Sequence, residues 1–274
     1  MRKDSILELV DKLPPLPKSI QEIEKLFAGK TFVETAKLVK IIEEDTALTA
    51  DILSFTNSPL FGFSKSIQSI QQAVVLFGAA QIRKMALKSA IFSSFDIDMS
   101  AYGITNEKFV QISSMQSELI FQWYMGIDIE KSKLLLPVAF LMEAGSIVIS
   151  RYILDNNLKD DFLNDIKNIS IKTAEIRHTS MTTLQVNYIL FEHWGLNEVF
   201  SKTMHTLDNE LYQADDFIKE LSFPLKVVRE TINLKEQLTD ESINKGVDLL
   251  NQTSYETSKF THACQRVRKK FQLD

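Results

Sequence analysis

Apolar residues recur at three- and four-residue steps along nearly the whole chain. Ile20, Ile23 and Phe27 form one such series, and Ala36 and Val39 begin another. This spacing places the apolar side chains on one face of a helix. No alternating pattern flanked by hairpin turns interrupts these series, and no internal repeat is visible. The pattern predicts an all-α protein.

Polar and helix-breaking residues mark where the first helices begin and end. Pro17 suits a first helical turn, because that position needs no N–H group. A helix is expected to begin near Asp45 and to end at Asn57, since the Ser58-Pro59 step disfavours further helix. Gly78 interrupts a later apolar series. Further expected boundaries are a helix stop at Gly29 and capping boxes at Thr31/Glu34, Ser69/Gln72 and Thr253/Glu256.

The polar stretch 96–106 is the best candidate for a boundary between two helical lobes. Beyond it, residues 134–154 carry a strongly buried face, with Pro137 expected in the first turn of that segment or at a kink. The other helices are expected at 108–123, 183–194, 197–210, 217–234, 241–250 and 254–271.

Composition supports helices and narrows the partner classes. The chain of 274 residues contains 8 Gly and 6 Pro, fewer than turn-dense β folds need. Its formal net charge is −5, so nucleic-acid binding is not expected. The single cysteine, Cys264, cannot form an internal disulfide. The longest apolar run, 134–142, is too short to span a membrane, and no leader pattern opens the chain. These features predict a cytoplasmic protein with no membrane association.

Four motifs in order resemble one known family. They are Leu-Pro-Pro-Leu-Pro at 13–17, Ile-Glu-Glu-Asp-Thr-Ala-Leu-Thr at 42–49, Asn-Ser-Pro-Leu-Phe-Gly at 57–62, and the segment 67–78 that ends in Phe-Gly. Together they resemble the HDOD domain, an HD-related output domain of bacterial signalling proteins. The family usually has Pro where this chain has Thr46, and Leu where it has Phe77. The motif positions are Pro14, Pro15, Pro17, Asp45, Asn57, Ser58, Gly62 and Gly78.

The resemblance covers residues 6–210 and implies an architecture. It implies a multi-helix, bundle-like HD-superfamily fold with two closely packed helical lobes. The N-terminal lobe is expected at about 6–95 and the HD-like lobe at about 105–210. The helices of 211–274 are expected to complete the same domain.

The resemblance also locates positions where HD-superfamily hydrolases hold metal. Their His-Asp doublet matches Met142-Glu143 here, fixed by Gly145 and its apolar flanks. The other matched positions are Ile112, Thr183, Leu207 and Asp208. Apolar side chains cannot hold a hard divalent cation, and a thioether suits soft ions. The resemblance therefore implies no catalytic residue, no bound metal and no cofactor.

Two other constellations stay open from sequence alone. Glu143, His205 and Asp208 are candidates for a remnant metal site. Glu175 and His178 form a Glu-x-x-His step, which puts both on one helix face. A di-iron bundle would need a second such step, and only one is visible.

We therefore expect a non-enzymatic regulatory module of a bacterial signalling pathway, with a protein partner and with a nucleotide as a further candidate ligand. One alternative is a residual or altered metal-dependent phosphohydrolase. A second is a nucleotide sensor that uses the former metal cavity, between the helices carrying Met142 and Leu207. The sequence does not indicate an oligomeric state.

Overall fold

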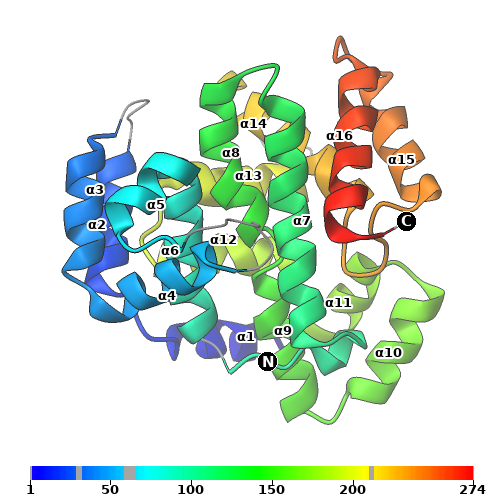
Figure 1. The fold of residues 1–274 in the computed structure, drawn as a ribbon. Coiled ribbons are helices and arrows are strands. Elements are labelled where there is room, and N and C mark those ends of the chain that lie inside the picture. The colour runs from blue at the N-terminus through cyan, green and yellow to red at the C-terminus, as the bar shows by residue number, and fades with distance from the viewer. Residues whose placement is uncertain (1, 29–32, 59–65, 95, 210–212, 274) are drawn as a thin grey trace. The chain divides into compact units, whose positions relative to one another are not determined.

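The computed structural model describes residues 2–28, 33–58, 66–94, 96–209 and 213–273 (Figure 1). Helices dominate the described ranges, and their only β-type pairing is an isolated bridge between Ile232 and Gln237. The all-α prediction is confirmed. The positions predicted for Gly29, Thr31, Pro59 and Gly62 lie outside the described residues. Glu34, the second residue of the box predicted at 31/34, directly precedes a helix that begins at Thr35, so it does not act as the third residue of a helix.

The chain divides into two compact units. The larger unit comprises 1–12, 97–193 and 198–274, and the smaller unit comprises 13–96 and 194–197. The division drawn from the sequence placed residues from 6 onward in the N-terminal lobe. The structure instead places α1 (Arg2–Asp11) in the larger unit, where its Ile6 and Val10 are fully buried. It contacts α9 (Gly145–Asp155), α11 (Ile171–Thr179) and α12 (Thr183–His193).

The helices of the smaller unit follow their sequence signals closely. They are α2 (Lys18–Phe27), α3 (Thr35–Glu43), α4 (Thr46–Thr56), α5 (Ile70–Phe77) and α6 (Ala79–Ser94). The Asp45 carboxylate caps α4 by accepting a hydrogen bond from Leu48 N at 3.0 Å, and α4 ends at Asn57 as predicted. Ser69 caps α5 in the same way, and Gly78 ends that helix with φ +79°.

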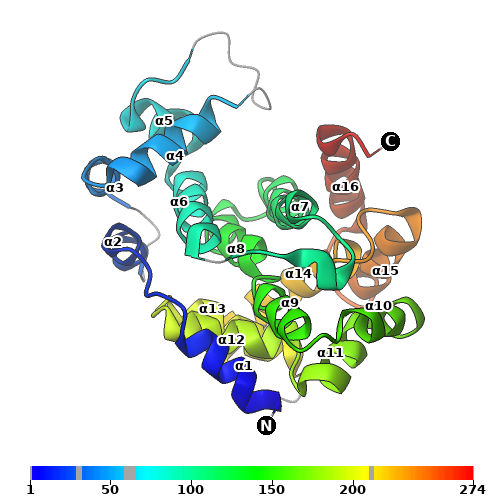
Figure 2. The same cartoon turned by 90° about the horizontal axis from the view of Figure 1, so that it is seen from below.

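Two groups of helices in the larger unit carry the residues of the candidate site (Figure 2). Helices α7 and α8 pack on each other, and α14 contacts both. Helices α9 and α12 pack together beside α11. The bounds are η2 (Met99–Tyr102), α7 (Asn106–Tyr124), α8 (Ile129–Leu141), α9 (Gly145–Asp155), α10 (Lys159–Asn168), α11 (Ile171–Thr179), α12 (Thr183–His193), α13 (Glu198–Asp208), α14 (Asp216–Thr231), α15 (Asp240–Leu250) and α16 (Thr257–Phe271).

Three helix boundaries of the larger unit differ from the sequence prediction, and one is the end of α14, which lies at Thr231 rather than at 234. Residues 134–154 form parts of two helices, with a turn at 142–144, and Pro137 lies in the interior of α8. Helix α16 begins at Thr257 rather than near 254. The Thr253 hydroxyl accepts from Tyr255 N, so this residue stabilises a local turn instead of capping the helix.

The segment Ile129–Asp155 is long and apolar enough to cross a membrane by composition alone. In the structure, 89% of its most apolar window is buried inside the fold. The turn at 142–144 also divides the segment into two helices. Its apolar character is accounted for by its place in the core of the larger unit.

Candidate functional site

A buried ion pair lies at the position matched to the His-Asp doublet. Glu143 sits in the turn between α8 and α9, and its side chain is 1% exposed. Arg229 of α14 donates from Nε to Glu143 Oε1 at 2.8 Å and from Nη2 to Oε2 at 3.2 Å. Burial opposes the charge of Arg229, but the Glu143 carboxylate raises the pKa of the guanidinium above its usual value. Both carboxylate oxygens are therefore engaged by a permanent cation.

Helix α7 adds a neutral group to this pair. Gln116 is fully buried and donates from Nε2 to the Ile232 carbonyl at 2.9 Å and, more weakly, to Glu143 Oε1 at 3.4 Å. The matched position Ile112 lies one turn earlier on α7 and is also fully buried. This part of α7 therefore offers the carboxylate one weak amide hydrogen bond, and Ile112 is a buried apolar side chain.

Asn187 of α12 fixes the turn that carries Glu143. Its Nδ2 donates to the Met142 carbonyl at 2.6 Å, and its Oδ1 accepts from Gly145 N at 2.6 Å. A Cβ at Gly145 would overlap the Thr183 carbonyl oxygen and approach Asn187 N to 2.9 Å. Glycine is required here because α9 and α12 approach so closely.

A second buried carboxylate, Glu175 of α11, has hydrogen bonds of its own. Its Oε1 accepts from Tyr102 Oη at 2.8 Å and from Thr183 Oγ1 at 2.6 Å, and its Oε2 accepts from Thr183 N at 2.8 Å. Burial raises the pKa of Glu175, and these hydrogen bonds and the charge of Arg229 oppose the shift. Burial followed by the charge of Glu175 raises the pKa of Tyr102 well above its usual value.

The remaining matched positions lie at the start of α12 and the end of α13. Leu207 is half-buried in the last turn of α13. Asp208 accepts from Thr182 Oγ1 at 2.7 Å and Gln185 Nε2 at 2.8 Å, and Lys172 Nζ lies 3.5 Å from it. Asp208 thus joins α12 to α13 by hydrogen bonds.

The candidate remnant site does not form. Glu143 is bound to Arg229, Asp208 to the start of α12, and the ring of His205 packs against Tyr188 with centroids 5.4 Å apart. In the described part of the chain, no group of three or more His, Cys, Asp or Glu residues is placed to hold a metal ion. The donor set at the doublet does not fit the metal centre that the HD superfamily implies.

The two residues of the Glu-x-x-His step on α11 also have different partners. Glu175 faces Tyr102 and Thr183, whereas His178 Nε2 lies 2.8 Å from Asp165 Oδ2 of α10. Hydrogen bonds from His178 and Arg177 lower the pKa of Asp165. Glu175 and His178 therefore stabilise different helix contacts.

The motif positions of the smaller unit have structural roles. Asn57 pairs through its side-chain amide with both the N–H and the carbonyl of Ile67, at 2.7 and 2.9 Å. The Pro14 carbonyl accepts from Trp194 Nε1 at 3.2 Å. Pro15 is exposed, and Ser58 N donates to the Phe55 carbonyl in the turn after α4.

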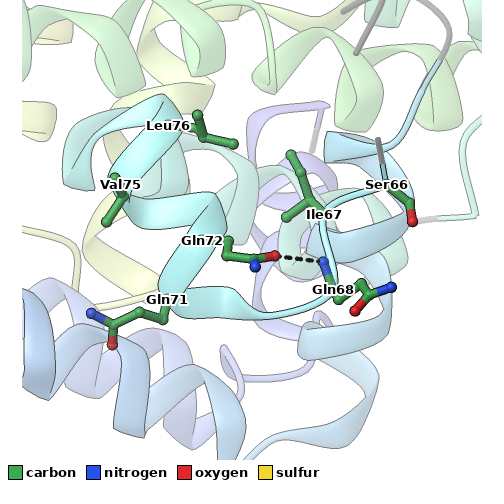
Figure 3. Close-up of a pocket in the computed structure, with 7 residues that line it drawn as sticks. All are labelled: Ser66, Ile67, Gln68, Gln71, Gln72, Val75 and Leu76. Carbon is green, nitrogen blue, oxygen red and sulfur yellow. Dashed lines mark hydrogen bonds between the residues drawn. The ribbon is translucent and has the colours of Figure 1, made fainter. Parts of the chain in front are cut away.

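A groove of about 710 Å³ lies on the smaller unit (Figure 3). Val75 and Leu76 of α5 line it and are 75% and 56% exposed. Gln72 closes one side, where its Oε1 accepts from Gln68 N at 2.9 Å. The groove is uncharged and partly apolar, which suits a protein surface better than a charged small molecule.

Comparisons with known proteins agree with this architecture. The model of the HDOD domain matches residues 13–209, more than half of the chain. A curated Treponema pallidum protein without an assigned function is 31% identical over 81 residues, which are 30% of this chain and 16% of that protein.

Three solved structures superpose over nearly the whole chain. A signal transduction protein from Marinobacter aquaeolei gives a TM-score of 0.74 at 16% identity, covering 99% of this chain and 64% of its own. A Shewanella amazonensis protein with the provisional name of a phosphohydrolase gives a TM-score of 0.69 at 15% identity, covering 98% of this chain and 96% of its own. A virulence factor from Campylobacter jejuni gives 0.59 at 24%, covering 96% and 95%. At these identities the likeness shows the fold alone.

Proposed function

This chain belongs to the HDOD family, and from that premise we propose that it is a non-catalytic regulatory module of a bacterial signalling pathway. It acts by binding a partner rather than by metal-dependent hydrolysis. The observation that carries the proposal is the ion pair between Glu143 and Arg229. It supports the sequence-based expectation because it supplies a reason, in the structure, why a hydrolytic metal is disfavoured.

The charge of Arg229 disfavours a metal ion beside Glu143. An arginine side chain stays protonated in proteins, so Arg229 holds a full positive charge against the only carboxylate of the doublet. A divalent cation about 4 Å from that guanidinium would be repelled by about 8 kcal/mol at an effective dielectric constant of about 20. Met142 and Ile112, both fully buried, offer no oxygen or nitrogen to offset this repulsion.

We propose that the chain instead binds a protein partner in the cytoplasm through its surface. The groove beside α5 is the candidate docking face of the smaller unit, because Val75 and Leu76 expose apolar side chains there. Isolated exposed apolar residues are ordinary, but two adjacent ones lining a groove favour an interaction.

Hydrolysis assays test the proposal. The purified protein is loaded with Mn²⁺ or Fe²⁺ and assayed against a chromogenic phosphodiester. We expect no turnover above the rate of the metal alone, in the wild type and in the Glu143→Gln variant alike. A turnover that appears with metal and disappears in Glu143→Gln would overturn the proposal and establish the alternative, a residual phosphohydrolase.

A further inference from the structure

A cavity of about 210 Å³ lies in the larger unit, where η2, α10 and α11 contribute to its lining. Helices α10 and α11 pack side by side (Figure 2). Neither Glu143 nor Arg229 is part of the lining, so this cavity is distinct from the buried ion pair. Its apolar lining consists of Tyr102, Leu163, Ile166, Ile171 and Leu234.

Contacts within the protein position the walls of this cavity. The ring of Tyr102 packs against Phe162 with centroids 5.1 Å apart, and its hydroxyl donates its one proton to Glu175. Leu234 lies in a turn in which Asn233 Oδ1 accepts from two backbone N–H groups. Because Tyr102 has no proton left to donate, the apolar walls offer a polar ligand body little compensation for lost water. The interior therefore suits a hydrocarbon group.

Two lysines lie at the rim of the cavity. Lys167, in the last turn of α10, and Lys235 both line it, and both are exposed to solvent. Lys235 Nζ donates to the Ile166 carbonyl at 3.4 Å, which places this ammonium group beside the apolar lining. Within the described ranges, neither lysine pairs with a carboxylate.

The carboxylates closest to these lysines in the sequence have other partners. Asp165 of α10 is bound by Arg177, and Glu236 is bound by Lys245. Among the described residues, the lining contains no acidic side chain and no arginine. The rim therefore carries a positive charge that an anionic group can neutralise.

We propose that this cavity binds a small monocarboxylate with an apolar body of about seven carbon atoms, such as octanoate. The body lies against the apolar lining, and the carboxylate lies at the rim beside Lys167 and Lys235. At about 30 Å³ for each water-sized group, the cavity holds about seven such groups, which sets the length of the body. Two separate ammonium groups, without the planar fork of arginine, suit one carboxylate better than a phosphate. This site goes beyond the proposed protein partner and does not depend on it.

A series of chain lengths tests the size of the site. Butanoate, hexanoate, octanoate and decanoate are titrated into the full chain by calorimetry at one ionic strength. Each CH₂ group added up to octanoate should tighten binding about fourfold, because the added group is buried. Decanoate should bind no more tightly than octanoate, because the cavity is then full. Affinity that still rises at decanoate, or an absence of octanoate binding, would overturn the inference.

A neutral analogue tests the role of the two lysines. Octanoate should bind the wild type about three- to tenfold more tightly than octanamide, which has the same length and no charge. The two ligands should bind equally to the Lys167→Gln/Lys235→Gln variant, which leaves the apolar lining intact.

A matched control removes two charges elsewhere on the larger unit. Lys12 and Lys269 are exposed and do not line the cavity, so Lys12→Gln/Lys269→Gln should keep the wild-type preference for octanoate. A preference that survives in the first double variant, or that is lost in the control variant, would overturn the inference.

A larger side chain in the wall tests the location directly. Ile166 is half-buried, so the indole of Ile166→Trp can occupy the cavity without replacing a fully buried residue. We expect this variant to keep the helical circular dichroism of the wild type and to lose octanoate binding. A folded Ile166→Trp protein with wild-type affinity for octanoate would overturn the inference.

The two proposals fail separately. Absence of octanoate binding would overturn the ligand site and leave the non-catalytic role standing. Metal-dependent turnover of a phosphodiester would overturn the non-catalytic role and leave the ligand site standing.

Discussion

Replacing Arg229 by methionine should leave the buried Glu143 carboxylate without a countercharge. Methionine retains much of the aliphatic volume and removes the guanidinium. Glu143 is 1% exposed, and its remaining side-chain bond within the described residues is the 3.4 Å contact from Gln116. Removing one partner of a buried pair costs about 3–5 kcal/mol. We expect a loss of unfolding free energy in that range near neutral pH.

Removing the charge of Glu143 as well should recover part of this loss. The double variant Glu143→Gln/Arg229→Met should be more stable than Arg229→Met alone, because no buried charge remains.

Urea unfolding followed by tryptophan fluorescence measures this in the larger unit. Trp123 is buried there and Trp194 belongs to the smaller unit, so a Trp194→Phe background leaves Trp123 as the reporter. Lys259→Met, which removes an exposed pair with Glu256, is the control and should cost less than about 1 kcal/mol. A loss from Arg229→Met no larger than that of the control, or no recovery of stability in the double variant, would contradict this prediction.

Three further predictions follow from the same geometry. Gly145→Ala should destabilise the protein by about 1–3 kcal/mol in urea unfolding, because the added Cβ meets the Thr183 carbonyl. Burial raises the pKa of Glu175, so its contribution to stability is largest below its unfolded pKa and is lost as the pH rises toward the raised value; Glu175→Gln should remove this slope from a stability–pH profile. Asp45→Ala should cost about 1–2 kcal/mol through loss of the α4 cap. Hydrogen bonds from Leu48 N and then Ser19 lower the pKa of Asp45. The contribution of Asp45 to the unfolding free energy is therefore present above its unfolded pKa and is lost as the pH falls through the lowered folded value. If the wild type lost no more stability than Asp45→Ala across that pH range, this prediction would be contradicted.

Local signals explain why much of the fold was predictable. Asp45, Asn57, Ser69 and Gly78 act within a few residues of themselves, and each boundary they predicted is observed. The periodic apolar pattern likewise predicted α7, α12 and α15, because burial of one face determines that pattern, but it gave no range for α6, α10 or α11.

Errors arose where a distant contact decided the outcome. The turn at 142–144 is fixed by Asn187, more than forty residues further along the chain. No residue within 134–154 predicts a turn at 142–144, and Pro137 suggested that any break would lie earlier in the segment. Thr253 has the residues of a capping box, but its hydroxyl is used by Tyr255 N.

Only one of the two residues of the buried ion pair could be predicted from the sequence. The matched positions identified Glu143 as the carboxylate that needed an explanation, but its partner Arg229 is 86 residues away. One signal could have found it. Arg229 follows Leu225 by four residues and precedes Ile232 by three, so a charged group interrupts the buried face of a helix. A charge at such a position requires a buried countercharge.

Titration of Mn²⁺ with the purified protein, followed by electron paramagnetic resonance, tests most directly whether Arg229 excludes metal from the doublet. We expect the spectrum of free Mn²⁺ to be unchanged at protein concentrations above that of the metal. Loss of the free signal with one Mn²⁺ bound per chain, reversed by Glu143→Gln, would contradict it.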